Sequence, residues 1–497
     1  MSPDRTLSPR TRFARDEGGA ILVLWALFLA VAFGFLALAF DLGRLATTQT
    51  QLQSFADQVA LAAAGELDGR PGARDRARDA AEGLISGQQT YAQGAQALGS
   101  GDFTLVFLST LPADDRDPAT AVATSDASAR FVQAVVDRRT VLTPFANVNA
   151  VLNGGTQISS EIAASATAGF TSYACDITPL FFCVPSAGWR AQNNVGIQIE
   201  AVSGSSGNGL WTPGNFGFLD PAVLPVDPTG PCNGLNGAPL YRCLVGAERG
   251  ITTCIETTAP LETRPGQAQG LTEAFNARFD IFQGSMNAYA NRAAYRPAPN
   301  VLSDLWRVGS GGGGSSAPTP PNLPSDSCIA SGTCRFGTGD WTRDAYLSTY
   351  HNNQWPIPGD PRLPADLPAR EDITRYDIYQ AEIRSARARG DAGMLTASGY
   401  ENMGRPGNHI SARTPADRAT LDPDRRTVVA AAVDCGNQSM DGRSNVTALE
   451  YVKLFMTEPV RGSGQDSRIR AEVVGSAGGI GSGAVNASFQ DFIQLYR

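Results

Sequence analysis

The stretch that decides the architecture is GGAILVLWALFLAVAFGFLALAFDLGRLATTQTQLQSFADQVALAAAGEL, residues 18–67. Its first half, from Ala20 to Phe40, is apolar and contains no charged residue. A helix over this run is about 30 Å long, which matches the hydrocarbon core of a membrane. The apolar core of a secretory signal is shorter, roughly 7–15 residues. The run therefore predicts a transmembrane helix, residues 20–40, that stays in the mature protein.

The flanking residues predict how this helix is oriented and where it continues. By the positive-inside rule, basic residues before the run place the N-terminus, a tail of residues 1–19, in the cytoplasm. These residues are Arg5, Arg10, Arg12 and Arg15. After the run, apolar side chains at helical spacing predict an amphipathic continuation to about residue 67. They are Leu42, Leu45, Leu52, Phe55, Val59 and Ala62. Because Ala37-Leu38-Ala39 fits a cleavage site, a removed signal remains the alternative.

Composition bounds the rest of the chain. The 497 residues carry a net charge of −8, which argues against a nucleic-acid partner because phosphates require clustered positive charge. The 53 glycines and 31 prolines predict a loop-rich body. His351 and His409 lie in polar, asparagine-containing surroundings, and we expect neither to be a metal ligand or a general base.

The cysteines indicate an oxidising compartment. They are even in number, lie in loop-rich sequence and form no CxxC motif, so disulfides are favoured over zinc. The cysteines that we expect to form disulfides are Cys175, Cys183, Cys232, Cys243, Cys254, Cys328, Cys334 and Cys435. Local disulfides are plausible for Cys175 with Cys183 and for Cys328 with Cys334, because each pair brackets a short loop. The pairing of the other four stays open, and free buried thiols are the alternative.

The remaining pattern predicts an α+β fold, mostly β and rich in loops. Residues 102–110, 129–148 and 155–170 alternate polar and apolar residues, which predicts three antiparallel strands, with a turn at Asp137–Arg139. We expect a small α+β domain over about 67–174. Thr427–Cys435 predicts a buried strand, whereas 373–390 and 447–460 fit a helix or a strand. The predicted organisation is a tail (1–19), a transmembrane helix (20–40), a membrane-proximal helical region (41–100) and an ectodomain (101–497) with a flexible loop at about 309–325.

The aromatic and glycine-rich stretch LWTPGNFGFLDP, residues 210–221, is the most distinctive part of the ectodomain. Its glycines allow backbone conformations that other residues avoid. It is interpreted as a loop that caps the core with its own aromatic side chains; a binding loop is the alternative.

Motifs for chemistry are missing from the sequence. There is no GxSxG elbow, no phosphate-binding GxxxxGK and no HExxH. Asp126-Ala127-Ser128 approaches a D-x-S-x-S metal motif, but Arg130 replaces its second hydroxyl. Acidic residues at 114–117 and at Asp422 and Asp424 are expected to be solvated. We therefore expect no catalytic residue, no metal, no cofactor and no enzymatic activity.

The N-terminal region resembles Flp pilus assembly proteins of the TadE/TadG type, from the tight-adherence (Tad) system. The residues that carry the resemblance are Phe13, Arg15, Asp16, Glu17, Gly19, Asp41, Gly43, Leu52, Gln53, Ala56, Asp57, Ala60 and Ala62–Ala64. TadG-like relatives also contain a C-D-x-T-P element followed by PGNFGFLD. Here these are Cys175, Asp176, Thr178 and Pro179, then Pro213, Gly214, Asn215, Phe216, Gly217, Phe218, Leu219 and Asp220.

The resemblance implies a membrane-anchored periplasmic component of a Tad/Flp-type pilus assembly system that acts through protein–protein assembly. Its implied partners are inner-membrane lipid and other pilus subunits or pseudopilins, with no nucleic acid or small-molecule substrate. Gly34, Ala37 and Ala39 are small enough for close helix packing. The first alternative is an anchored adhesin or structural envelope protein independent of pili. The second is a periplasmic hydrolase or carbohydrate-binding enzyme.

Overall fold

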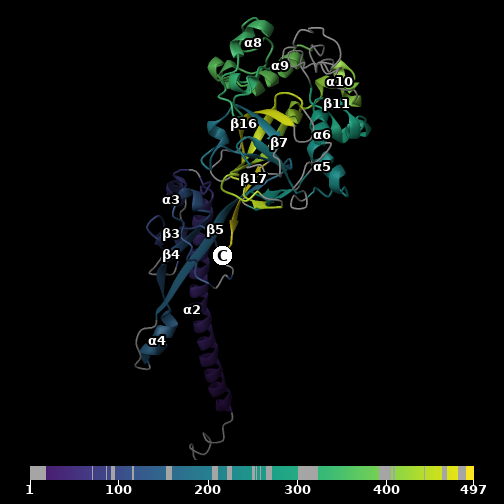
Figure 1. Cartoon of the computed structure of the whole chain (residues 1–497). Coiled ribbons are helices and arrows are strands. Elements are labelled where there is room, and N and C mark those ends of the chain that lie inside the picture. Colours follow the sequence, from purple (N-terminus) through teal and green to yellow (C-terminus); the bar gives the residue numbers. More distant parts are fainter. Residues whose placement is uncertain are drawn as a thin grey trace, which may run out of the picture. The chain divides into compact units, whose positions relative to one another are not determined.

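The computed structural model divides the chain into two compact units, each described by itself (Figure 1). The first comprises Met1–Phe170 and Ile493–Arg497, and the second comprises Thr171–Phe492. The structure describes residues 18–69, 71–84, 87–90, 96–112, 114, 117–152, 159–203, 211–220, 226–248, 252, 254–257, 259–264, 271–299, 323–390, 405–406, 409–440, 443–461, 467–478 and 489–496. The predicted tail up to residue 17, the motif residues Asp16 and Glu17, and the predicted loop over 309–322 lie outside these ranges.

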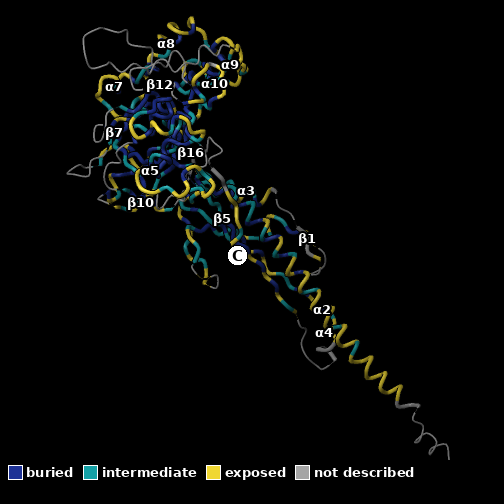
Figure 2. Tube along the Cα trace, turned by 90° about the vertical axis from the view of Figure 1, so that its right-hand side faces the viewer, coloured by how far each residue is buried: buried dark blue, intermediate teal, exposed yellow. Residues whose placement is uncertain are grey.

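The first unit is organised around the long helix α2, Gly18–Ala64. In Figure 2 its N-terminal half is exposed along its length, whereas its second half is partly buried. This confirms the expectation that the apolar run begins a helix and that the same helix continues beyond it.

The second half of α2 lies on a sheet with the strand order β17-β5-β4-β3. The strands are β3 (Phe103–Leu108), β4 (Phe131–Leu142), β5 (Ser159–Ala174) and β17 (Phe489–Leu495). β3 pairs antiparallel with β4, which pairs antiparallel with β5, as predicted. The shorter elements are α3 (Ala73–Leu84), β1 (Gly87–Gln89), β2 (Gln96–Leu98), η1 (Asp126–Ser128) and α4 (Pro144–Leu152).

The predicted turn at Asp137–Arg139 is wrong. β4 continues through these residues to Leu142, with a bulge in which Asp137 and Arg138 lie opposite the single residue Ala163. A bulge accommodates extra residues without ending the strand. Asp102 holds the bulge, because its backbone oxygen accepts from the Asp137 N–H at 2.9 Å and its carboxylate pairs with Arg139.

The second unit contains a mixed sheet with the order β14-β10-β8-β6-β13-β15-β16-β7. Its strands are β6 (Leu180–Cys183), β7 (Gln198–Ser203), β8 (Asn215–Leu219), β10 (Leu261–Arg264), β13 (Thr427–Val433), β14 (Asn445–Val446), β15 (Glu450–Met456) and β16 (Arg468–Gly478). β7 also pairs with β8, so the path from β8 to β7 closes into a six-stranded ring. A closed ring leaves no unpaired edge among its members.

β13 is buried on both faces, which explains its continuous apolar sequence. Val428, Ala430 and Ala432 join one apolar cluster, whereas Ala431 and Val433 join another on the opposite face. The prediction of a buried strand at Thr427–Cys435 is confirmed. β13 runs parallel to β6, from a distant part of the chain, with Ala431 opposite Phe181.

Helices and short strands surround this ring. They are α5 (Gly237–Gly246), α6 (Leu271–Ala277), α7 (Ser327–Ala330), α8 (Arg343–Tyr350), α9 (Arg375–Ala388), α10 (Pro415–Ala419), β11 (Ile281–Phe282) and β12 (Arg405–Pro406). The short strand β9 (Ile255–Glu256) instead pairs with the end of β5. The 3-10 helices of this unit are η2 (Ala191–Asn193), η3 (Gly284–Tyr289), η4 (Ala293–Tyr295), η6 (Pro364–Asp366), η7 (Arg370–Asp372), η10 (Ile410–Ala412) and η11 (Pro423–Arg426). The ambiguous segment 373–390 is thus mostly helical, and Thr374 and Asp377 form a capping box at the start of α9.

The eight cysteines, all among the described residues, form four disulfides: Cys175–Cys254, Cys183–Cys435, Cys232–Cys243 and Cys328–Cys334. The local Cys328–Cys334 bridge agrees with the expectation. The proposed Cys175–Cys183 bridge is wrong. Cys183 ends β6, which is the parallel neighbour of β13, and this pairing brings Cys183 to Cys435.

The interpretation of residues 210–221 as a loop is incorrect for Asn215–Leu219. Asn215–Leu219 is strand β8, placed between β6 and β10 in the sheet. The membrane-related boundaries at residues 19, 40 and 100 stay predictions. The compact division falls instead at Phe170, inside β5, because α2 shares its core with the sheet of the first unit.

Candidate functional site

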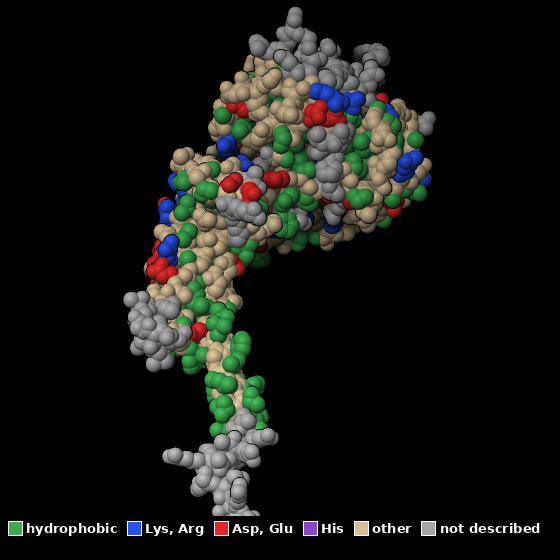
Figure 3. Space-filling model, turned by 90° about the horizontal axis from the view of Figure 1, so that it is seen from below, with side chains coloured by type: hydrophobic (Ala, Val, Ile, Leu, Met, Phe, Trp, Pro, Cys, Tyr) green, Lys and Arg blue, Asp and Glu red, His purple; other side chains and the backbone are tan. Residues whose placement is uncertain are grey.

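The N-terminal half of α2 presents an apolar surface. None of the side chains from Ile21 to Phe40 is buried, and Leu22 and Phe35 are about 70 % exposed, at 74 % and 69 %. Figure 3 shows hydrophobic side chains covering this part of the helix. Monomeric soluble proteins rarely expose so large a contiguous apolar surface. The helix is long and apolar enough to cross a membrane, which is consistent with a single-pass anchor.

The second half of α2 carries a stripe of buried side chains that packs on the sheet of the first unit. Its fully or almost fully buried members are Asp41, Thr48, Leu52, Phe55, Ala56, Val59, Ala60, Ala63 and Ala64. Steps of three and four residues place such side chains on one face of a helix. Four of the alanines that carry the resemblance therefore have a packing role, since small side chains let the helix approach the strands closely: Ala56, Ala60, Ala63 and Ala64.

Asp41 marks the end of the apolar run and is 4 % exposed. Its carboxylate accepts from the backbone N–H of Ala146 at 2.8 Å and of Phe145 at 3.5 Å, in the first turn of α4. Unpaired N–H groups and the helix dipole favour an anion at this end of a helix. Next to Asp41, the Phe40 ring meets the Phe145 ring edge to face, with centroids 5.5 Å apart. These contacts fix the start of α4 beside residues 40 and 41.

Gln53 and Asp57 join α2 to β5. The Gln53 side-chain amide donates to the Asp57 carboxylate at 2.9 Å and to the Ser165 backbone oxygen at 3.1 Å. One turn earlier, the Gln49 amide donates to the Ala163 oxygen at 3.3 Å. Two glutamines thereby occupy backbone acceptors of β5, which gives Gln53 of the family motif a structural role.

Gly43 has no such explanation within the described residues. A Cβ at Gly43, or at Gly34, would meet no atom within 4 Å. Glycine inside a helix costs about 1 kcal/mol relative to alanine. Neither glycine is required by packing against the described parts of this chain.

The C-D-x-T-P element ends at Pro179, directly before β6, and PGNFGFLD contains β8; the Leu219 N–H donates to the Pro179 oxygen at 3.2 Å. Phe181 of β6 lies opposite Gly217 of β8, and a Cβ at Gly217 would lie 2.5 Å from the Phe181 ring. Gly217 is therefore required by close ring packing. Gly214 takes a positive φ of 82°, and its N–H donates to the Cys183 oxygen at 2.9 Å. These residues hold two strands together and form no open binding loop.

The other members of this motif lie around the same pair of strands. Asn215 begins β8, and its side-chain oxygen accepts from the Thr212 N–H at 3.0 Å. Phe216 is buried in the core, and Pro213 is in the turn before β8. Upstream, Asp176 has a positive φ of 53° and follows the disulfide-bonded Cys175.

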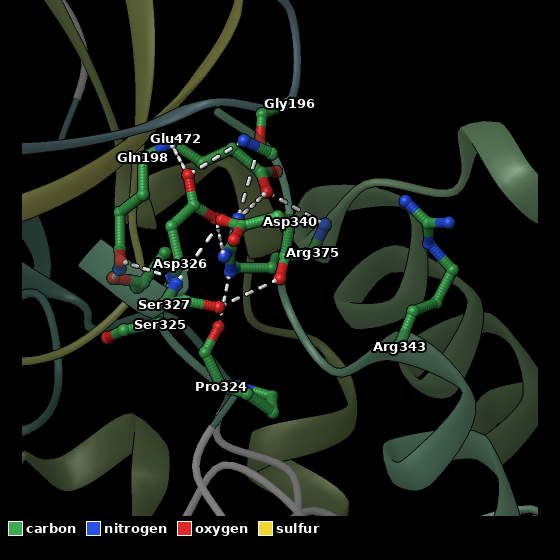
Figure 4. Close-up of polar contacts among 12 residues, drawn as sticks. Gly196, Gln198, Pro324, Ser325, Asp326, Ser327, Asp340, Arg343, Arg375 and Glu472 are labelled. Carbon is green, nitrogen blue, oxygen red and sulfur yellow. Dashed lines mark hydrogen bonds and ion pairs between the residues drawn. The ribbon is translucent and has the colours of Figure 1, made fainter. Parts of the chain in front are cut away.

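A buried ionic cluster in the second unit was not predicted from the sequence (Figure 4). The guanidinium of Arg375 pairs with Asp326 and, at 2.9 Å, with Glu472, and all three side chains are fully buried. Glu472 also accepts from the backbone N–H groups of Arg375 and Tyr376, both at 2.9 Å, so it caps α9. Burial raises the pKa of Glu472, while Arg375 and these N–H groups oppose the rise. No local sequence pattern indicates this cluster, because Asp326, Arg375 and Glu472 lie far apart along the chain.

This cluster has a structural role inside the second unit. Asp326 accepts from the backbone N–H groups of Gln198 at 3.1 Å and of Gly339 at 2.9 Å. The Arg375 guanidinium donates to the backbone oxygens of Pro324 at 2.6 Å and of Gly196 at 3.2 Å. Replacing one partner of a buried ion pair is costly because the other charge is left uncompensated. The cluster therefore joins β7, β16 and α9 to the loop after Leu323.

Both histidines are held inside the second unit. His351 Nε2 lies 2.8 Å from Glu382, which also accepts from the Tyr346 hydroxyl at 2.8 Å. His409 Nε2 lies 2.8 Å from the Arg292 oxygen, and burial lowers the pKa of His409.

The acidic candidates have protein partners. Asp126 pairs with Arg74 at 2.7 Å, and this hydrogen bond lowers its pKa. Asp424 accepts from Gln380 at 3.1 Å, and Asp422 accepts from the Asp424 N–H at 2.9 Å. Across the described part of the chain, no group of three histidine, cysteine or acidic residues could hold a metal ion.

The first unit thus has one helix that can span a membrane and that continues without a break into a folded body. Residues 19–66 match the family model described as putative Flp pilus-assembly TadE/G-like. The match coincides with α2 and confirms the resemblance of the N-terminal region; the chain therefore carries a Tad-type pilus-assembly segment. No curated protein and no solved structure matches the chain.

Proposed function

We propose that this protein is an inner-membrane component of a Tad/Flp-type pilus assembly system, with a cytoplasmic N-terminus and a periplasmic bulk. The observation that carries the proposal is the coincidence of the family match with α2, whose apolar half is exposed. The arginines before the run support the orientation. The four disulfides support a periplasmic body, since that compartment is oxidising.

The protein acts by assembly and not by catalysis. Other single-span pilus subunits or pseudopilins pack against α2 within the membrane. Gly34 is a natural contact point, because its surface is open and membrane helices approach closely at small residues.

The first test is the state of the mature N-terminus. Membranes are extracted at alkaline pH, and the intact mass of the native protein is measured. We expect the protein to stay in the membrane fraction with residues 20–40 present. A soluble chain that begins near Phe40 would instead indicate cleavage after Ala37-Leu38-Ala39 and would refute the anchor.

The second test concerns the role in pili. A deletion strain is complemented with wild-type protein, with Gly34→Leu or with Phe35→Leu, and surface pili are counted by electron microscopy. We expect pili to be lost in the deletion and reduced with Gly34→Leu, because a larger side chain separates the helices. Phe35→Leu is the matched control, since it replaces an exposed apolar side chain by another. Normal pili with defective attachment in the deletion strain would favour an adhesin.

A further inference from the structure

The connection between β4 and β5 is an unusual segment of the first unit. The sequence from Thr140 to Ser160 contains no charged residue and includes helix α4. Val141 of this segment is buried in the core, but three of its larger apolar side chains are substantially exposed: Leu142 45 %, Phe145 47 % and Val148 57 %. A loop in water is normally polar, so these side chains require a partner or an apolar environment.

The position of α4 is fixed relative to α2. The Asp41 carboxylate binds the N–H groups of the first turn of α4, and the Phe40 and Phe145 rings pack edge to face. In Figure 1, α4 lies beside α2, away from α3. The first turn of α4 is therefore level with residues 40 and 41, where the apolar run of α2 ends.

The charged residues of β5 begin near the same level. Gln49 and Gln53 bind the backbone oxygens of Ala163 and Ser165, so four residues of helix match two residues of strand. These distances agree, at about 6 Å and about 6.6 Å, which shows that α2 and β5 run side by side in the same direction. Because four residues of α2 match two residues of β5, Glu161 is about level with Arg44. Glu161 pairs with the exposed Arg138 at 3.3 Å. The last charged residues of α2, β4 and β5 therefore lie within about one helical turn of the same height.

We propose that α4 and the ends of the strands beside it lie in the surface of the membrane that residues 21–40 cross. This inference rests on the proposed function, because it needs α2 to be in the bilayer. Phe145, Val148 and Leu142 enter the boundary between headgroups and acyl chains, as in interfacial helices. The segment lacks lysine and arginine, so apolar insertion and not anionic-lipid attraction drives the contact. The contact of α4 with the membrane surface, added to the membrane-spanning part of α2, restricts tilting of the first unit relative to the membrane.

The test is photo-crosslinking of the full-length protein in native membranes. A photoreactive phenylalanine analogue replaces Phe145 or Val148, and phospholipid adducts are measured by mass spectrometry. Leu29, in the apolar run, is the positive control. Val122 is the matched negative control, because it is 59 % exposed and lies far from α4. It pairs with Leu108 of β3, which lies opposite Phe131, the first residue of β4. Measured along β4, this end is about 35 Å from Leu142.

We expect about tenfold more lipid adduct at positions 145 and 148 than at 122, and a strong adduct at 29. Adducts at 29 with only background at both 145 and 148 would overturn the interfacial helix and leave the anchor intact. Crosslinks from 145 and 148 to a second copy or to another protein would also overturn it and would identify an assembly surface. Background at 29 as well would reject the anchor itself.

Discussion

At the scale of single residues, Asp41 shows how a charge is accommodated where the apolar run ends. Its carboxylate is nearly buried and lies one residue beyond Phe40, yet backbone N–H groups of α4 satisfy it. The family motif has an aspartate here, and in this structure that side chain positions α4. Asp41 is therefore a structural residue, and its replacement should destabilise the start of α4.

Replacing Asp41 by alanine tests this role. Loss of a capping carboxylate costs about 1 kcal/mol, so backbone amides in α4 should exchange with deuterium about fivefold faster. Hydrogen–deuterium exchange of the peptide containing residues 144–148 measures the effect. Asp75→Ala is the control, because Asp75 is 81 % exposed and pairs only locally with Arg78. Equal exchange in the two variants would contradict the capping role.

Glu450 predicts a pH dependence of stability. Its carboxylate is buried, accepts from the Ala191 N–H at 2.6 Å, and has a pKa raised by burial. An acid with a raised folded-state pKa gives stability at low pH that is lost as the pH rises through that pKa. Glu450→Gln keeps the contact with Ala191 and removes the charge. The variant should therefore be more stable than wild type at pH 7, by on the order of 1 kcal/mol.

Urea unfolding of both proteins between pH 4 and pH 8 measures this difference. The advantage of Glu450→Gln should be smallest at the acidic end, where wild-type Glu450 is protonated as well. Asp75→Asn serves as a control that changes the same charge on the surface. An advantage that does not change with pH would show that Glu450 is not responsible.

At the scale of elements, the sequence predicted those whose pattern is local. The apolar run gave α2, alternation gave β3, β4 and β5, and a continuous apolar stretch gave β13. The missed elements depend on distant partners. Asn215–Leu219 resembles a loop because of Gly217, but the glycine is needed so that Phe181 of the neighbouring strand can pack closely. The Arg375 cluster was not predicted for the same reason, since its partners Asp326 and Glu472 are distant in the sequence.

The disulfides allow a prediction about the sheet of the second unit. Cys183–Cys435 spans 252 residues, whereas Cys328–Cys334 spans 6. In the chain-entropy model, closing these loops stabilises by about 5 and about 2 kcal/mol respectively. The double variant Cys183→Ser/Cys435→Ser should therefore unfold at a lower denaturant concentration than Cys328→Ser/Cys334→Ser. Equal midpoints would mean that loop length does not decide the contribution of these bridges.

At the scale of the whole molecule, the last described strand, β17, returns to the first unit. The Tyr496 N–H donates to the Thr167 oxygen at 2.8 Å, and its ring packs edge to face on Phe131 at 5.3 Å. A Cβ at Gly65 of the N-terminal region would lie 3.2 Å from Ile493. The second unit is thus an insertion between β5 and β17 of the first.

Removing the Tyr496 ring tests the importance of this closure. Tyr496→Ala should destabilise the first unit by about 1–2 kcal/mol, because an aromatic pair and its buried area are lost. Limited proteolysis, with mapping of cleavage sites before residue 170, measures the effect. Tyr496→Phe is the control, since it keeps the aromatic ring that packs on Phe131. Similar cleavage of both variants would show that the ring of Tyr496 contributes little.

The pairing of β17 with β5 can form only after the residues between these two strands have been synthesised. All of Thr171–Phe492 is translated before the final strand exists. At about 5–20 residues per second, this delay is on the order of 15–60 s. Until then one edge of β5 is unpaired, which is a site for wrong pairing or proteolysis. A product that stops before residue 489 lacks β17 and leaves that edge of β5 unpaired.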